Sequence, residues 1–319
     1  LFERADWDFG AWTLRSVRTG KYLTEDKNFF DETPQDENAV TIDPGMNCTA
    51  DVVFGWFVKE LLYAKEEDGV LYLDTWQHRA VAVNDENKLV AKAGSGDCPC
   101  KQFTLEVVSS GAERVAELAQ RADHVIVCAG NQPLINAREE YDRPDIRLPK
   151  AQTALLDAAA AANESTLLYL VTGYPFAINK EKDTAKAVLC STHLGPCLGH
   201  VAAATVFGEN NPAGRTPTTW YRSVRDLPAL DDYDIAKNHV TYLYFRGKPL
   251  YAFGYGLSYT TFAYSNPTVK QENGEVIATI NVQNTGALDG DEVVQLYMSL
   301  PSSLRVRPIH ALKAFKRVH

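Results

Sequence analysis

The sequence lacks the patterns that most zinc-binding, membrane-spanning and nucleic-acid-binding proteins carry. Its six cysteines include no pair at zinc-finger spacing, because Cys98 and Cys100 are separated by one residue and no paired Cys and His set accompanies them. No apolar run reaches the roughly 20 residues of a spanning helix. The 41 acidic residues outnumber the 32 basic ones, and the net charge of −9 disfavours nucleic acid and anionic membranes. We therefore expect no metal, no cofactor, no nucleic-acid partner and no membrane partner.

The positions of the cysteines indicate thiols that pack in the protein interior and not thiols that bind metal or react. Cys128 and Cys190 each stand in an apolar run, where a free thiol behaves as a small buried hydrophobic group. A disulfide among Cys48, Cys98 and Cys100 remains open as an alternative for these three. Most of the thiols are therefore predicted to be structural.

The two ends of the chain predict a piece of a larger protein. The sequence begins with Leu1 rather than Met, and it stops abruptly after His319. Because the true N-terminus is not seen, the cellular location stays unknown, either cytoplasmic or secreted.

A charged loop between two regular elements is the most informative segment. The apolar run 123–130 ends in Gly and predicts a buried strand of a parallel sheet. Helical spacing follows from Pro149 to Asn163, and a second apolar run, 166–173, completes a strand–helix–strand unit. The loop 138–149 therefore leaves the carboxyl end of a strand, where ligands of such sheets bind.

Three ordered motifs carry a family resemblance. The first is Glu-Glu-Tyr-Asp-Arg at 139–143, followed by Leu-Pro and Gln152. The second runs from Gly208 to Trp220, and the third from Pro249 to Phe262. Together they resemble the C-terminal half of glycoside hydrolase family 3, whose members include β-glucosidases and β-xylosidases.

The resemblance implies a retaining glycosidase that uses two carboxyl groups. Alignment with the family pattern Glu-Gly-x-Asp-Arg makes Glu139 the general acid/base, with Glu140 as the fallback. Asp142 and Arg143 become candidate substrate contacts, although a role in positioning the loop is also open for both. The family's aspartate nucleophile lies on an N-terminal barrel that this sequence does not show, so that barrel, in the same protein or a processed chain, is the expected partner.

A second class of function remains open at this point. Without the barrel, the chain could be a non-catalytic carbohydrate-binding or interaction protein. The charged loop favours the enzyme, because a binding module has no need of it. The expected substrate is a β-glycoside, with terminal β-linked glucose or a related sugar.

Residues 1–109 have the pattern of an all-β domain. Short apolar segments separated by turn residues predict strands at 12–17, 54–59, 69–73, 80–84 and 103–108. The run Leu-Arg-Ser at 14–16, followed by Gly-Lys-Tyr-Leu at 20–23, is similar to a fascin-like β-trefoil repeat. Trp56 and Trp76 are candidate sugar-stacking surfaces at the rim of the site, with core packing as the alternative.

These observations predict a multidomain fold that combines α/β and all-β parts. Residues 1–109 would form a fascin-like β-trefoil insert, and residues 110–262 the family's flavodoxin-like α/β sandwich. Residues 263–319 alternate in two strands at 276–282 and 292–298 and resemble a truncated fibronectin type III-like β-sandwich.

Overall fold

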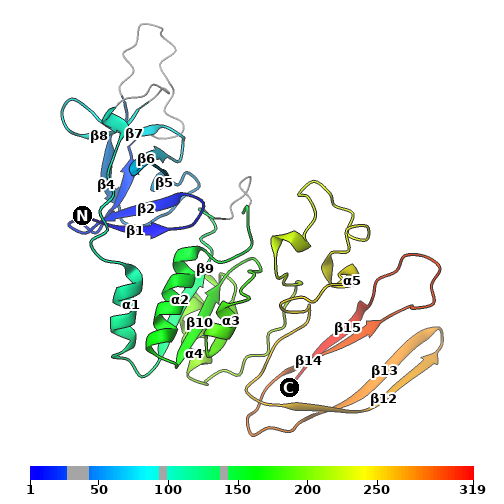
Figure 1. The fold of residues 1–319 in the computed structure, drawn as a ribbon. Helices are drawn as coiled ribbons and strands as arrows, with labels where there is room; N and C mark the ends of the chain where they lie inside the picture. The colour runs from blue at the N-terminus through cyan, green and yellow to red at the C-terminus, as the bar shows by residue number, and fades with distance from the viewer. Residues whose placement is uncertain (27–42, 93–98, 137–142) are drawn as a thin grey trace. The chain divides into compact units, whose positions relative to one another are not determined.

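The computed structural model describes residues 1–26, 43–92, 99–136 and 143–319, and these form a mixed α/β structure (Figure 1). Its strands are β1 (Phe2–Asp6), β2 (Ala11–Ser16), β3 (Tyr22–Glu25), β4 (Met46–Ala50), β5 (Leu61–Glu67), β6 (Val70–Thr75), β7 (Ala80–Val83), β8 (Leu89–Lys92), β9 (Val125–Gly130), β10 (Thr166–Val171), β11 (Ala187–Ser191), β12 (Phe262–Glu272), β13 (Glu275–Asn284), β14 (Glu292–Met298) and β15 (Ala311–Val318). Its helices are η1 (Pro99–Lys101), α1 (Gly111–Ala119), α2 (Lys150–Ala162), α3 (Glu181–Thr184), η2 (Gly195–Cys197), α4 (Leu198–Val206), η3 (Val224–Asp226) and α5 (Thr241–Tyr244).

The chain divides into two compact units. The first comprises residues 1–174 and 180–191, and the second comprises residues 175–179 and 192–319. The first unit therefore holds both the N-terminal β-region and the parallel sheet. The domain boundaries at 109 and 262 stay predictions, because this grouping measures compactness and not sequence domains.

The described residues between 1 and 103 form one antiparallel sheet that closes on itself, and we call this region the β-insert. Its strands follow the order β4-β3-β2-β5-β6-β7-β8, and β1 pairs with β2. A bridge between Gly45 and Val90 joins the two ends of that order, and the Ala91 N–H donates to the carbonyl of Pro44 at 2.8 Å. Closure leaves no open edge along this path and encloses an apolar interior.

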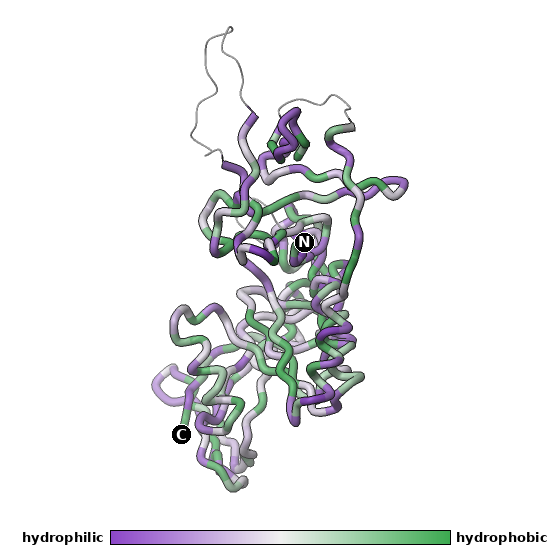
Figure 2. The backbone as a smooth tube through the Cα atoms, turned by 90° about the vertical axis from the view of Figure 1, so that its left-hand side faces the viewer, coloured by the Kyte–Doolittle hydropathy of each residue, from purple (hydrophilic) through white to green (hydrophobic). Residues whose placement is uncertain are grey.

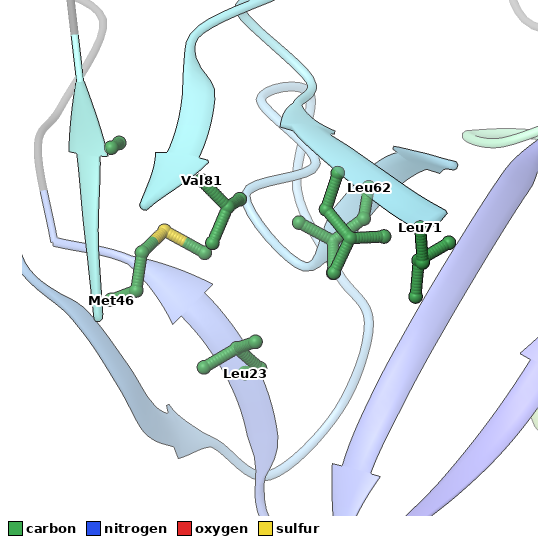
Figure 3. Close-up of a cluster of buried hydrophobic side chains, with 7 residues drawn as sticks. Leu23, Met46, Leu62, Leu71 and Val81 are labelled. Atoms are coloured by element: carbon green, nitrogen blue, oxygen red, sulfur yellow. The ribbon is translucent and has the colours of Figure 1, made fainter. Parts of the chain in front are cut away.

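The interior of the β-insert is a cluster contributed by almost every strand (Figure 3). The buried members are Leu23, Met46, Leu62, Leu71, Leu73, Val81 and Ala91. On β6 the burial alternates residue by residue, as expected where one face of a strand points inward. The apolar alternation in the sequence thus specifies the inward face.

Two of the predicted strands of the β-insert are wrong. Residues 54–59 form bends and turns, and the strand lies just beyond, at β5. Residues 103–108 contribute only an isolated bridge between Phe103 and Leu71, while Val107 and Val108 are exposed. The predictions at 12–17, 69–73 and 80–84 are confirmed by β2, β6 and β7. Apolar composition marked the wrong segments, because apart from the Phe103 bridge these residues do not pair with a neighbouring strand.

The parallel sheet follows the predicted strand–helix–strand unit. Its order is β11-β10-β9, and Leu168 of β10 pairs with Val127 and with Val188. α1 begins with a capping box in which Ser110 Oγ accepts from the Glu113 N–H and the Glu113 carboxylate accepts from the Ser110 N–H. α1 and α2 contact each other and lie side by side (Figure 1).

The expectation of buried thiols on this sheet is wrong. Cys128 on β9 and Cys190 on β11 are free and exposed. In the part of the chain that the structure describes, these are the two outer strands of the sheet, so their flanks are only partly covered. Cys48 is a free thiol, whereas Cys100 is disulfide-bonded, which settles the open alternative for these two residues.

The C-terminal strands form two separate hairpins. β12 pairs with β13, and β14 pairs with β15, each in an antiparallel two-stranded sheet. β13 and β14 confirm the strands predicted at 276–282 and 292–298. Figure 2 shows hydrophobic and hydrophilic segments alternating along the backbone. Among the described residues no helix combines the length and the apolarity required to cross a membrane.

Candidate active site at the end of strand β9

The carboxyl end of β9 is closely packed against β10. Gly130 adopts φ +143°, and a Cβ atom built on it would lie 1.8 Å from the carbonyl oxygen of Val171. No side chain fits this approach, so Gly is required where the strand ends. The loop that begins here therefore starts from a fixed backbone position.

Gln152 of α2 holds this strand end from the helix side. Its Oε1 accepts from the Gly130 N–H at 2.9 Å, and its Nε2 donates to the Gly130 carbonyl at 3.0 Å. One amide side chain thus satisfies both backbone groups that a further strand would otherwise pair. This gives Gln152, singled out by the first motif, a structural role at the edge of the sheet.

The first residues of the loop form a closed turn. Gln132 Oε1 accepts from the Leu134 N–H at 2.7 Å, and Asn136 Oδ1 accepts from the Gln132 N–H at 2.9 Å. Before the turn, Asn131 Oδ1 accepts from the Gly173 N–H at 3.2 Å, which ties it to the residues after β10. These side-chain bonds fix residues 131–136 without any regular secondary structure.

Leu134 and Ile135 bring this turn against the β-insert. Ile135 is 8% exposed and packs in a cluster with Ala11, Val58 and Leu61 of the β-insert. Leu134 packs against the same cluster, as do further partly buried side chains of the β-insert, namely Trp7, Val53, Tyr63 and Trp76. The sequence analysis missed Asn131, Gln132 and Ile135. Only their place directly after the strand could have drawn attention to them.

The far end of the loop is held by a cation–π contact and an ion pair. The Arg143 guanidinium lies 5.2 Å from the centroid of the Tyr174 ring. Asp145 accepts from the Arg147 side chain at 2.7 Å and from the Arg147 backbone at 3.1 Å. Burial would raise the pKa of Asp145, but the bonds from Arg147 outweigh it and lower that pKa. Asp145 is therefore held as a carboxylate.

The predicted site residues lie in three situations. Glu139, Glu140 and Asp142 lie outside the described residues. Arg143 is half-buried beside Tyr174. Trp76 is half-buried, its ring centroid lies 5.6 Å from that of Phe57, and it packs on the cluster that contains Ile135.

The second and third motifs pair with each other. Trp220 and Tyr251 form a backbone bridge, and their rings meet edge to face at 5.6 Å. The Thr216 N–H donates to the Tyr255 carbonyl at 2.8 Å, and the Gly254 N–H donates to the Thr216 carbonyl at 2.8 Å. These motifs are therefore mainly architectural within their own unit. No group of three or more His, Cys, Asp and Glu side chains that could hold a metal occurs in the described ranges.

Comparison with known proteins identifies the family. Residues 20–259 match the glycosyl hydrolase family 3 C-terminal domain. The chain belongs to glycoside hydrolase family 3. A periplasmic β-glucosidase of Salmonella typhimurium is 34% identical over 220 residues, which are 65% of this family 3 chain and 29% of that protein. A β-xylosidase of Formosa agariphila is 26% identical over 341 positions, covering 95% of this chain and 47% of that protein.

Solved structures agree with the sequence match. A β-glucosidase from Kluyveromyces marxianus in complex with glucose aligns with a TM-score of 0.60 and 28% identity. The alignment covers 73% of the family 3 chain and 31% of that protein. The chain therefore spans less than half the length of these relatives.

Proposed function

We propose that this family 3 chain supplies the acid/base half of a retaining β-glycosidase site. The substrate is a β-glycoside with a terminal glucose or a related sugar. One observation carries the proposal: in a chain of this family, the segment with the Glu-Glu-Tyr-Asp-Arg motif follows the carboxyl end of β9, where ligands of parallel sheets bind. The glucosidase and xylosidase names of the relatives support the substrate class.

The mechanism divides the work between two carboxyl groups about 5–5.5 Å apart. The nucleophile belongs to an N-terminal barrel, in the same protein or in a processed chain, and attacks the anomeric carbon. Glu139 protonates the leaving oxygen and later removes a proton from water, with Glu140 as the fallback. The fixed end of β9 and the closed turn 131–136, which both precede this motif in the chain, support the assignment. A general acid must be held at a defined position relative to the leaving oxygen.

Asp142, Arg143 and Trp76 are the proposed substrate contacts. Arg143 can present donors to sugar hydroxyls from the position that Tyr174 gives it. Trp76 can offer a sugar only the part of its ring that is not packed on the cluster around Ile135.

The architectural part of the proposal concerns the three regions. The β-insert is assigned a fascin-like β-trefoil origin, which its closed antiparallel sheet supports. The parallel sheet β11-β10-β9 is assigned to a flavodoxin-like sandwich, and the hairpins β12–β13 and β14–β15 to a fibronectin type III-like sandwich.

The test of the proposal is Glu139→Ala in the complete enzyme, that is, this chain together with its nucleophile domain. General acid catalysis typically contributes about 10²–10⁴-fold, so hydrolysis of an alkyl glucoside should fall by that factor. Formation of the glycosyl-enzyme from a dinitrophenyl glucoside should be nearly unchanged, because that leaving group needs no proton. Azide should rescue the second step, since an anion needs no base.

Glu140→Ala is the matched control, because it removes the neighbouring carboxylate of the same loop. It should show neither the substrate dependence nor the azide rescue. If Glu140→Ala shows both and Glu139→Ala resembles wild type, the acid/base is Glu140. If neither variant is affected, the acid/base is neither of these two residues and the proposed role of this loop is wrong.

A further inference from the structure

Two hydrophobic side chains of the loop after β9, Leu134 and Ile135, pack against the β-insert. Of the four buried residues in the cluster, Ala11, Val58 and Leu61 belong to the β-insert, and Ile135 alone comes from the loop after β9. Leu134 accompanies it at the periphery. The loop therefore reaches away from the parallel sheet and packs on a different structural region of the same compact unit.

The surface that receives Ile135 is itself held in place. Val58 is fully buried and Leu61 is 3% exposed, so the side chains that contact Ile135 are themselves closely packed. The Trp7 indole donates to Thr13 Oγ1 at 3.2 Å, and Trp76 lies against Phe57. A close-packed wall of this kind restricts the side chain that enters it to one arrangement.

The turn 131–136 transmits that restriction to the backbone. Its internal bonds join the Gln132 and Asn136 side chains to backbone N–H groups, so Ile135 cannot move without moving the whole turn. Asn136 is the last described residue before the segment that carries Glu139 and Glu140. The described residues that directly precede this segment are thus supported by the β-insert.

The other end depends on different contacts. Arg143 lies over Tyr174, and Asp145 binds Arg147, all outside the β-insert. Loss of the Ile135 contact would therefore loosen the turn 131–136 and leave the Asp145 and Arg147 pair in place.

We propose that the β-insert positions the acid/base segment through Leu134 and Ile135, with Ile135 as the positioning residue. This inference rests on the proposed function, because it assigns the acid to the segment that follows the turn. A misplacement of about 1 Å can cost about 10²-fold in rate. The β-insert then contributes to the protonation step and not only to stability.

The test compares two truncations of buried aliphatic side chains in the complete enzyme. Ile135→Ala removes the anchor, and Leu23→Ala opens a similar cavity in the other core of the β-insert, which does not include Ile135. Ile135→Ala should lower kcat/KM for an alkyl glucoside by about 10- to 100-fold. It should lower kcat/KM for the dinitrophenyl substrate by less than about threefold, because kcat/KM reports formation of the glycosyl-enzyme and only the alkyl leaving group needs the acid in that step.

Leu23→Ala should affect the two substrates equally, and Ile135→Leu should restore most of the alkyl glucoside activity. Amide exchange at residues 131–136 should rise in Ile135→Ala and stay as in wild type in Leu23→Ala. Should Ile135→Ala fail to accumulate as folded protein, Ile135→Val replaces it. The same difference between the two substrates is then expected, but it should be smaller.

Equal losses for both substrates in the Ile135 variant would overturn the inference while leaving the proposed function intact. Unchanged exchange at residues 131–136 would overturn it in the same way. If Glu139→Ala and Glu140→Ala both behave as wild type, the proposed function fails and the inference fails with it.

Discussion

The β-insert and the C-terminal hairpins are both antiparallel, yet they bury their side chains very differently. On β6 every second residue is buried, whereas β12 has no buried residue and β13 none. The sheet of the β-insert closes through the Gly45 and Val90 bridge, while each C-terminal hairpin pairs only within itself. Alternating apolar residues thus specify a strand, but the burial of one face requires further strands to enclose it.

The largest expected effect tests this difference directly. Leu62 of β5 is fully buried, and Leu62→Ala should cost about 3 kcal/mol of unfolding free energy through the cavity it leaves. Ile277 of β13 is 40% exposed, and Ile277→Ala should cost under about 0.5 kcal/mol. Native-state amide exchange of the 319-residue chain, followed separately in β5 and β13, measures both. Similar costs at the two positions would break the comparison.

A second prediction concerns the buried ion pair in each region. Arg79 donates to Glu25 at 2.7 Å, and the Glu25 side chain is 1% exposed. Arg215 and Glu292 form the counterpart at 2.8 Å, where Glu292 also accepts from the Val293 N–H. Breaking a buried pair commonly costs about 3–5 kcal/mol, and the partial exposure of Arg79 reduces this to about 2 kcal/mol for Arg79→Ala.

Arg215→Ala should cost less than Arg79→Ala, because the backbone N–H of Val293 remains to bind Glu292. Chemical denaturation followed by exchange in β3 and β14 compares the two. The double change of Arg79→Ala with Glu25→Gln should recover part of the loss, since no buried charge is then left alone. A greater loss in Arg215→Ala would contradict the expected order.

The smallest effect depends on pH and belongs to the β-insert alone. Glu60 is 5% exposed, and burial raises its pKa above the usual 4.5, with its own backbone N–H and Lys59 opposing the shift. The folded chain therefore binds this proton more tightly than the unfolded chain. The resulting stability is fully present below the usual pKa and is lost as pH rises through the folded one.

Glu60→Gln should consequently raise Tm near pH 7 and have little effect near pH 4, where Glu60 is mostly protonated in both states. Thermal unfolding of wild type and variant at the two pH values gives the difference. A stabilisation that is equal at both values would show that charge is not the cause.

The sequence allowed part of the fold to be predicted because that part depends on local periodicity. The apolar run at 123–130, the helical spacing after Pro149 and the alternation at 276–282 correspond to β9, α2 and β13. The segments at 54–59 and 103–108 had suitable composition, but beyond the Phe103 bridge they do not pair with a strand, and composition alone does not show this.

The candidate site was less predictable, since its geometry depends on distant segments. Gln152 was found because the motif contains it, but its two hydrogen bonds to the Gly130 backbone follow from the packing of α2 on β9. The partners of Ile135 lie at positions 11, 58 and 61, and nothing in the residues around 135 indicates them. Glu139, the proposed acid/base, lies outside the described residues and stays a prediction.

The close approach of β9 and β10 has a consequence for protein engineering. A Cβ at Gly130 would lie 1.8 Å from the Val171 carbonyl oxygen, so a combinatorial library has no useful diversity to sample at position 130. Position 152 is nearly as constrained, because both ends of its amide are engaged. Randomisation of this region should spare these two positions and begin beyond the turn, after Asn136.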